Sequence, residues 1–249
     1  MRLQKSYDQG TLLNDSSVDW SGFSREALLA QIRGKAGEGS ITRLRHLEVR
    51  YEVTDHCNAE CIMCPRDLHK FGRPHGIMDQ RKYEKSVDEV AALGCKQVVL
   101  ESFGEPMVDK RLEQKIAYAN AKGMRTFIIS NCSLLTRKRA KALIESGLDQ
   151  LRVSFYGMRK ETYEKVMVGL NFETTMDNLK NFLELRAEMG SKKPRMEINW
   201  LVLPENEGDT QYFQDYWEPR ADAIEIWKPH NFGDGRSYRE RFDEVALKN

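Results

Sequence analysis

Short apolar runs alternate along the chain with longer amphipathic stretches. Apolar runs with the length and composition of buried strands cover residues 47–53, 97–100, 126–129, 151–153, 196–203 and 223–227. Between them, apolar residues recur three and four positions apart, as on one face of a helix, within 79–94, 109–123, 137–146, 172–183 and 210–217. The pattern predicts a regular succession of strands and helices after about residue 46.

Polar residues and glycines mark the ends of several of these helices. Short polar side chains favour the N-cap, because they accept hydrogen bonds from the free N–H groups of the first turn. Glycine favours the position after a helix, because it readily takes the left-handed conformation. We expect N-caps at Asp79, Asp109 and Thr136, and helix ends at Gly94, Gly123 and Gly147.

Repeated strand–helix units predict an α/β fold. Consecutive units of this kind give parallel strands joined by right-handed crossovers. Both an open doubly wound sheet and a barrel satisfy that rule, and periodicity does not decide between them. We expect an N-terminal appendage at 1–45 with a short helix starting near Ser24, a core at 46–235 and a C-terminal tail at 236–249.

Composition and charge narrow the function classes. Of the 249 residues, 40% are hydrophobic and 31% are charged, with 39 Lys and Arg against 38 Asp and Glu. That balance predicts neither nucleic-acid binding nor attachment to an anionic membrane. No apolar run approaches the ~20 residues of a membrane span, and the N-terminus lacks an apolar signal-peptide region. We expect a cytoplasmic protein, since its five cysteines suit a reducing compartment.

Three cysteines follow the first predicted strand at the spacing C-x3-C-x2-C. They are Cys57, Cys61 and Cys64. Clustered thiolates favour soft metals such as iron–sulfur clusters, zinc or copper(I). A structural zinc site uses four protein ligands, whereas a [4Fe–4S] cluster held by three cysteines leaves one iron open. The alternatives are a zinc site and three unrelated buried thiols.

With Met63 before the last cysteine, this triplet resembles the signature of radical S-adenosylmethionine (SAM) enzymes, and the resemblance extends from about Leu47 to Gly233. It implies a partial (β/α)6 barrel resembling a TIM barrel, with the cluster at its top. It also implies that the open iron chelates SAM. An electron from a donor such as flavodoxin or ferredoxin then cleaves SAM to methionine and a 5′-deoxyadenosyl radical, which abstracts a substrate hydrogen.

Further motifs of the family follow the ends of the next two strands. Gly104, Glu105 and Pro106 match its G-E-P motif, which implies contact with the SAM amino group. Ser130 and Asn131 begin a stretch that resembles T-N-G-x-L-L, which implies contact with SAM, although turn formation and capping also explain them. Cys132 stands where the family has glycine, which puts the usual conformation of this loop in doubt.

The later strands end in residues with further implied roles. By the resemblance, Ser154 binds the SAM ribose, Val202 contacts adenine, and Lys165 substitutes for an arginine that Val168 replaces. His230 to Gly233 resemble a motif of members that carry a SPASM domain, so Lys228 and His230 are expected to face the substrate. Catalytic loops follow the strand ends of barrel enzymes, as all these motifs do.

The reaction after hydrogen abstraction stays open. The SPASM-like core implies a peptide or a sugar or aminocyclitol substrate, modified by dehydrogenation, epimerisation or a related reaction. For an epimerisation, Cys132 and Tyr156 are the expected hydrogen-atom donors, with packing as the alternative for Cys132. No cysteine follows Cys132, so we expect either a single-cluster enzyme or the catalytic part of a longer protein. The second function class is a non-catalytic iron–sulfur electron carrier or sensor.

Overall fold

The computed structural model describes residues 48–64 and 75–228. Contacts divide the chain into two compact units, Met1–Arg43 and Leu44–Asn249, and every described residue belongs to the second. The fold below is therefore that of the predicted core.

Several predictions fall outside the described residues. They concern the appendage at 1–45 with its helix near Ser24, the tail at 236–249, and His230. The domain boundaries stay predictions.

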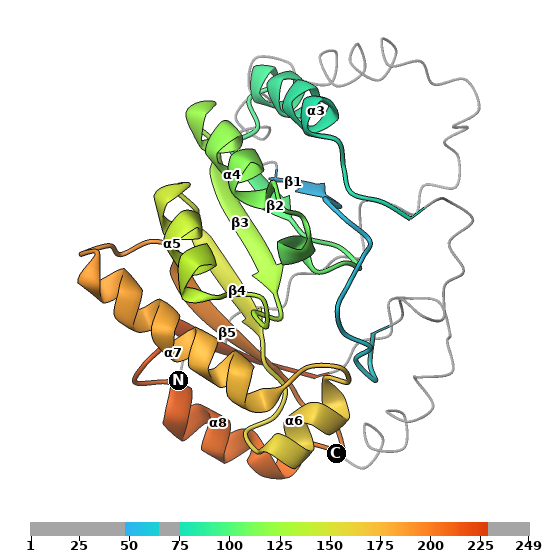
Figure 1. The fold of residues 1–249 in the computed structure, drawn as a ribbon, viewed down its shortest axis with the longest axis vertical. Coiled ribbons are helices and arrows are strands. Elements are labelled where there is room, and N and C mark those ends of the chain that lie inside the picture. The colour runs from blue at the N-terminus through green and yellow to red at the C-terminus, as the bar shows by residue number, and fades with distance from the viewer. Residues whose placement is uncertain (1–47, 65–74, 229–249) are drawn as a thin grey trace, which may run out of the picture. The chain divides into compact units, whose positions relative to one another are not determined.

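A parallel six-stranded sheet forms the centre of the described fold (Figure 1). Its strands are β1 (Glu48–Tyr51), β2 (Gln97–Leu100), β3 (Arg125–Ser130), β4 (Gln150–Ser154), β5 (Arg195–Leu201) and β6 (Ala223–Trp227). The strands follow one another in sequence order, and each pairs in parallel with the next. The α/β prediction is confirmed, and β1 and β6 are the open edges of the described sheet.

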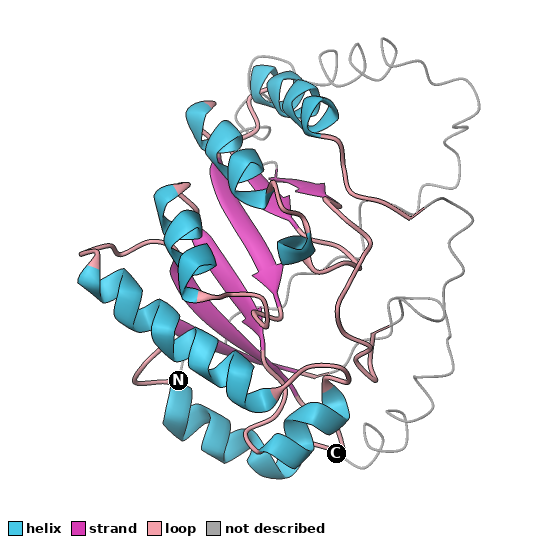
Figure 2. Cartoon of the chain, in the orientation of Figure 1, coloured by secondary structure: helices cyan, strands magenta, loops and turns pink. Residues whose placement is uncertain are grey.

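Helices lie along one face of this sheet (Figures 1 and 2). They are α3 (Gln80–Ala92), α4 (Leu112–Ala121), α5 (Arg137–Glu145), α6 (Lys160–Val166), α7 (Phe172–Glu188) and α8 (Thr210–Trp217), with short 3-10 helices η2 (Pro106–Val108) and η3 (Glu207–Asp209). Right-handed crossovers between strands in sequence order all pass on the same side. This is the arrangement of a partial barrel, which the resemblance implies.

The predicted caps are confirmed at two of three helices. The side chain of Asp79 accepts hydrogen bonds from Arg81 N and Lys82 N, and that of Thr136 accepts one from Arg139 N. The cap at Asp109 was wrong, because Asp109 ends η2 and the N-cap of α4 is Arg111, although Asp109 Oδ1 accepts a hydrogen bond from Arg111 N at 2.8 Å. Helix α6 was not predicted, since its seven residues show too little of a helical period.

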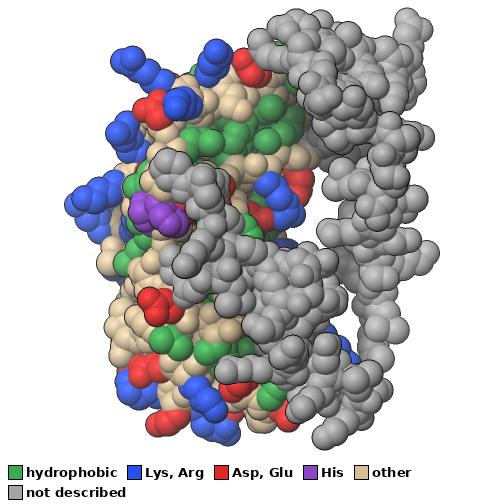
Figure 3. All heavy atoms as spheres, turned by 90° about the vertical axis from the view of Figure 1, so that its right-hand side faces the viewer, with side chains coloured by type: hydrophobic (Ala, Val, Ile, Leu, Met, Phe, Trp, Pro, Cys, Tyr) green, Lys and Arg blue, Asp and Glu red, His purple; other side chains and the backbone are tan. Residues whose placement is uncertain are grey.

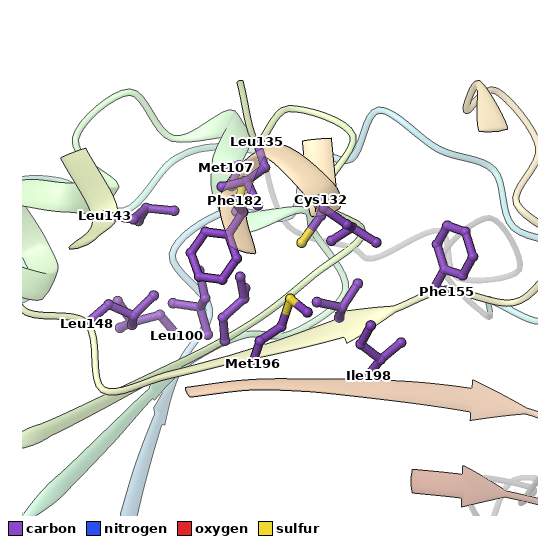
Figure 4. Packing of buried hydrophobic residues seen from close by; sticks show 14 of the residues in the cluster. Leu100, Met107, Cys132, Leu135, Leu143, Leu148, Phe155, Phe182, Met196 and Ile198 are labelled. Carbon is purple, nitrogen blue, oxygen red and sulfur yellow. The ribbon is translucent and has the colours of Figure 1, made fainter. Parts of the chain in front are cut away.

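The two faces of the sheet differ in chemistry. The face toward the helices belongs to the hydrophobic core, with side chains such as Leu100 and Ile198 (Figure 4). Ile128 and Val153 belong to the same core. We call the opposite one the inner face. Alternation and register assign to it Arg50, Val99, Phe127, Arg152, Ser154, Glu197, Asn199 and Glu225. Charged side chains therefore line much of the inner face.

Candidate active site

The loop after β1 carries the three cysteines. We call residues 54–64 the cysteine loop. Cys57, Cys61 and Cys64 are half-buried, and a tight turn brings Cys64 N to 2.9 Å from Cys61 O. Among residues 48–64 and 75–228, no three side chains of Cys, His, Asp or Glu lie close enough together to hold a metal ion. The three sulfurs therefore share one loop without converging on one point.

Gly104 packs its backbone against the cysteine loop. A Cβ atom placed on Gly104 would lie 2.1 Å from Thr54 O and 2.8 Å from His56 O, so no larger residue fits without a backbone shift. The next residue continues the contact, since Glu105 N donates to His56 O at 2.9 Å. The glycine of the G-E-P motif is thus required by a close approach of two loops.

The carboxylate of Glu105 joins the ends of β2 and β3. It is 3% exposed and accepts hydrogen bonds from Ser130 Oγ at 2.7 Å, Asn131 N at 2.8 Å and Met107 N at 3.0 Å. Burial raises the pKa of this carboxyl, and the three hydrogen bonds act in the opposite direction. Pro106 is also buried and begins η2. Contact of these residues with the SAM ammonium stays a prediction.

The loop after β3 contacts the cysteine loop through side chains. Asn131 Nδ2 donates to Asn58 Oδ1 at 3.0 Å, and Asn58 Nδ2 donates to Ser133 Oγ at 2.7 Å. Ser130 Oγ donates to Glu105 and accepts from Cys132 N at 2.9 Å. Ser130 and Asn131 thus bind other parts of the chain, and their contact with SAM stays a prediction.

The end of α6 and the residues after it contact the second half of the cysteine loop, at Glu60 and Ile62. Glu60 N donates to Val168 O at 2.8 Å, and Ile62 N donates to Val166 O at 3.0 Å. The position where the family has an arginine is therefore beside the cysteines, occupied here by the exposed Val168. Lys165, the expected substitute, is exposed.

Cys132 keeps the left-handed conformation that a glycine would favour, with φ of 57°. Its side chain is fully buried and lies in the hydrophobic core with Met107, Leu135 and Phe182 (Figure 4). Burial strongly raises the pKa of the thiol, which keeps it protonated. These surroundings favour the packing alternative, and hydrogen-atom donation by Cys132 stays a prediction.

Tyr156 follows the end of β4 and packs against the hydrophobic core. Burial raises the pKa of its hydroxyl to about 12, a hydrogen bond with Ser154 lowers it, and the charges of Cys61 and Cys64 raise it further. Both Tyr156 and Ser154 are half-buried. Ribose binding by Ser154 and hydrogen-atom donation by Tyr156 stay predictions.

Asn199 is a candidate residue that the sequence reasoning missed. It lies on β5 in register with Ser154 on β4 and Glu225 on β6, on the inner face. It is 2% exposed, and its Oδ1 atom is buried without a hydrogen-bond partner. A polar residue inside the apolar run 196–203 was the only available signal.

Three further expected site residues follow the carboxyl ends of β1, β5 and β6. Val202 is half-buried, and its N–H donates to Trp227 O at 2.9 Å. Met63 is half-buried and packs against the core. Lys228 is exposed at the end of the described chain. Their contacts with adenine, SAM and substrate stay predictions.

Two histidines form the histidine patch on the surface in Figure 3. They are His56 and His75, whose ring centroids lie 6.1 Å apart. His75 Nδ1 lies 2.9 Å from Oδ2 of the buried Asp55. This contact ties residues 75 and 76 to the start of the cysteine loop, since Asp55 Oδ1 also accepts from Gly76 N at 2.9 Å.

Comparison with known proteins decides the family. The sequence pattern of the radical SAM superfamily matches residues 51–215, more than half of the 249 residues. The chain belongs to the radical SAM superfamily. The cofactors of this superfamily are a [4Fe–4S] cluster and SAM.

Radical SAM proteins of several activities are similar to this chain. GTP 3′,8-cyclase of Lactiplantibacillus plantarum is 26% identical over 173 residues, which are 69% of this chain and 50% of that protein. PqqA peptide cyclase of Bradyrhizobium diazoefficiens is 31% identical over 122 residues, 48% of this chain and 31% of that protein. The chain thus spans half or less of the length of these two relatives.

Solved structures share the radical SAM fold. SuiB of Streptococcus suis bound to S-adenosylmethionine superposes with a TM-score of 0.63, covering 91% of this chain and 53% of that one at 14% identity. TYW1 with a lysine-pyruvate adduct bound superposes with a TM-score of 0.53, covering 90% of this chain and 79% of that one at 18% identity. At these identities the likeness shows the fold alone.

The donor set of this radical SAM chain fits its cluster. Three soft thiols stand on one short loop, and three cysteines are the protein ligands that leave one iron open.

Within residues 48–64 and 75–228, no helix combines the length and apolarity that crossing a membrane requires.

Proposed function

We propose that Cys57, Cys61 and Cys64 hold the [4Fe–4S] cluster, and that the enzyme uses SAM to abstract a hydrogen atom from its substrate. The observation that carries the proposal is the support of the cysteine loop, which is held by Gly104, by Asn131 and by the carbonyl of Val168. The proposal requires the three sulfurs to turn toward a common point when the cluster assembles. The bound cofactors supply the electron and the 5′-deoxyadenosyl radical.

SAM binding is assigned to the loops around the cysteines. The 104–106 segment, Met63, Ser130 and Asn131 would bind its methionine part. Ser154 and Asn199 would accept hydrogen bonds from the ribose hydroxyls. They are in register on neighbouring strands, and Asn199 Oδ1 has no other hydrogen-bond donor among the described residues. Val202 contacts adenine.

Return of a hydrogen atom is assigned first to Tyr156. It follows the end of β4, and burial raises the pKa of its hydroxyl to about 12, which keeps the hydroxyl protonated. Cys132 is the second candidate, and it requires the core around its thiol to open, since the side chain is fully buried.

We propose a peptide substrate. The similarity to PqqA peptide cyclase supports this class. The inner face also supports it against a nucleoside triphosphate, because Arg50, Arg152 and Arg195 each form an ion pair with a glutamate and leave little positive charge for phosphates. A sugar or aminocyclitol is the alternative.

The proposed electron donor is a flavodoxin or a ferredoxin. The proposed location is the cytoplasm, because a reducing compartment keeps the cysteine thiols reduced.

The test uses the full chain, reconstituted anaerobically with iron and sulfide. We expect about four irons per chain and reductive cleavage of SAM to 5′-deoxyadenosine with dithionite. Alanine at position 57, 61 or 64 should remove both. Cys95→Ala is the matched control, because Cys95 is a buried thiol that donates to Gln97 O, away from the triplet. A triple cysteine variant that keeps its four irons and cleaves SAM would contradict the proposal.

A further inference from the structure

Three polar side chains close a ring of hydrogen bonds between two loops. Asn131 Nδ2 donates to Asn58 Oδ1 at 3.0 Å, and Asn58 Nδ2 donates to Ser133 Oγ at 2.7 Å. Ser133 Oγ in turn donates to Asn131 Oδ1 at 2.7 Å, and Ser133 N donates to the same oxygen at 2.9 Å. We call Asn58, Asn131 and Ser133 the amide bracket. Every member is both donor and acceptor, so the ring fixes the orientation of both amides.

The bracket is fixed on the side of the loop after β3. Asn131 N donates to the buried carboxylate of Glu105 at 2.8 Å. Asn178 on α7 donates through Nδ2 to Cys132 O at 3.1 Å and to Ser133 O at 2.9 Å. Asn131 and Asn178 are both buried. This side is therefore a rigid support made by a strand end, a neighbouring loop and a helix.

The other side of the bracket is the cysteine loop at its first ligand. Asn58 directly follows Cys57 and is exposed. The backbone hydrogen bonds of the loop fall on either side, since His56 O accepts from Glu105 N, and Glu60 N donates to Val168 O. The bracket thus adds a side-chain contact between these backbone contacts, one residue after Cys57.

We propose that Asn131 and Ser133 are positioning residues that set the place of Cys57 through Asn58. The inference rests on the proposed role of Cys57 as a cluster ligand. Groups that orient a metal ligand without touching the metal change metal affinity by roughly 10–100-fold when removed. Loss of the bracket should accordingly loosen the cluster while the sheet and its helices stay folded, because the ring lies at the rim and not in the core.

The experiment compares holoprotein variants at both ends of the sheet. Asn131→Ala removes two links of the ring, and Ser133→Ala removes the hydroxyl alone. Ser133→Thr keeps the hydroxyl and serves as the conservative rescue. The matched control is Asn120→Ala, because Asn120 Nδ2 also bridges separate segments, donating to Gly147 O at 2.8 Å and Thr126 Oγ1 at 3.1 Å, before β3 and away from the cysteines.

Three measurements report on the cluster and one on the fold. They are the rate of iron loss to a chelator, the midpoint potential, the electron paramagnetic resonance spectrum of the reduced cluster with and without SAM, and the thermal unfolding temperature. We expect Asn131→Ala and Ser133→Ala to lose iron roughly tenfold faster or more, with altered spectra. We expect Ser133→Thr and Asn120→Ala to keep the wild-type rate and spectra.

Each outcome has a distinct meaning. Wild-type rates, potential and spectra in Asn131→Ala and Ser133→Ala would overturn the inference, provided that Cys57→Ala loses the cluster. A wild-type protein that binds no cluster would instead contradict the proposed function. If Asn131→Ala does not fold, Ser133→Ala still decides, since it deletes one exterior hydroxyl of a half-buried residue.

Discussion

The side-chain oxygen of Asn199 on β5 is buried, and none of its described neighbours donates a hydrogen bond to it. Asn199 Oδ1 is buried without a donor, and such an acceptor costs about 1–3 kcal/mol relative to a hydrogen-bonded one. A ligand hydroxyl that donates to this oxygen recovers that free energy on binding. The cost is therefore an argument for a ligand at the inner face, next to Ser154.

Replacement of Asn199 by leucine tests this directly. Leucine has a similar volume and no polar atom, so we expect the SAM-free protein to be as stable as wild type or more so. The affinity for SAM should fall about tenfold, the equivalent of one lost hydrogen bond of about 1.4 kcal/mol. Urea denaturation and SAM titration of the holoprotein measure the two effects. A clear loss of stability together with unchanged SAM affinity would make Asn199 a structural residue.

Cys132 illustrates what a single residue type reveals about its position. The departure from glycine predicted a changed loop, yet the loop keeps φ of 57° at Cys132. A non-glycine residue there costs roughly 1–2 kcal/mol. Burial of the side chain in the core offsets part of that cost. Sequence alone gave the conflict but not its resolution, because the core contacts come from distant residues such as Phe182.

At the scale of elements, local patterns predicted most bounds. The runs at 97–100, 210–217 and 223–227 agree with β2, α8 and β6, since apolar periodicity and polar ends are local properties. The start of α4 was placed too early because Asp109, a typical capping residue, ends η2 here, and a turn at residues 110 and 111 precedes the helix. The short α6 was missed because its two buried residues, Tyr163 and Val166, give no repeated period.

Asp222 connects two elements and gives a pH prediction. Its carboxylate, just before β6, accepts a hydrogen bond from Met196 N on β5 at 2.7 Å. It also forms an ion pair with Arg186 on α7 at 2.5 Å. Burial alone would raise the pKa of its carboxyl, but Arg186, Met196 N and Arg195 together hold the pKa below its usual value. A depressed pKa in the folded state stabilises above the unfolded value, and this stability is lost as the pH falls through the folded pKa.

Asp222→Asn should therefore be less stable than wild type at pH 7 and should approach it as the pH falls below about 4. Urea denaturation between pH 7 and pH 2.5 measures the difference. Asp177→Asn is the control, because Asp177 lies on the exposed face of α7 with Lys180 at 4.0 Å. Equal pH dependence in Asp222→Asn and wild type would contradict the assigned ion pair.

At the scale of the described fold, sequence-order topology explains where the chemistry lies. Parallel strands joined on one side place all their carboxyl ends at one rim, and the cysteine loop, the G-E-P motif, the amide bracket and Tyr156 follow those ends. The motifs were readable from the sequence. The bracket was not, because Asn58 and Asn131 are 73 positions apart and their contact depends on how two loops meet.

The inner face is held together by a cation that spans four strands. The guanidinium carbon of Arg152 on β4 lies 5.0 Å from the ring centroid of Phe127 on β3 and 5.1 Å from that of Trp227 on β6. Its Nε lies 2.5 Å from Glu197 on β5, and a terminal nitrogen lies 3.7 Å from Glu225 on β6. Arg152 thus links four of the six described strands and lies between two carboxylates.

Arg152→Met should lower the free energy of unfolding by about 2–4 kcal/mol. Breaking a buried ion pair by removing one partner costs about 3–5 kcal/mol when the other charge is left unpaired. Two features reduce the cost here, because Arg152 is 17% exposed and Arg195 still lies 3.6 Å from Glu197. The double variant Arg152→Met, Glu197→Gln should regain most of the loss, since methionine still packs between the rings and no buried charge is left. Urea denaturation of the three proteins measures both changes.

Arg137→Met serves as the control, because Arg137 pairs with Glu188 at the surface and such pairs contribute about 1 kcal/mol or less. Equal losses in Arg152→Met and Arg137→Met would mean that the inner face does not depend on this cation, and a double variant no better than Arg152→Met would assign the loss to packing and not to charge.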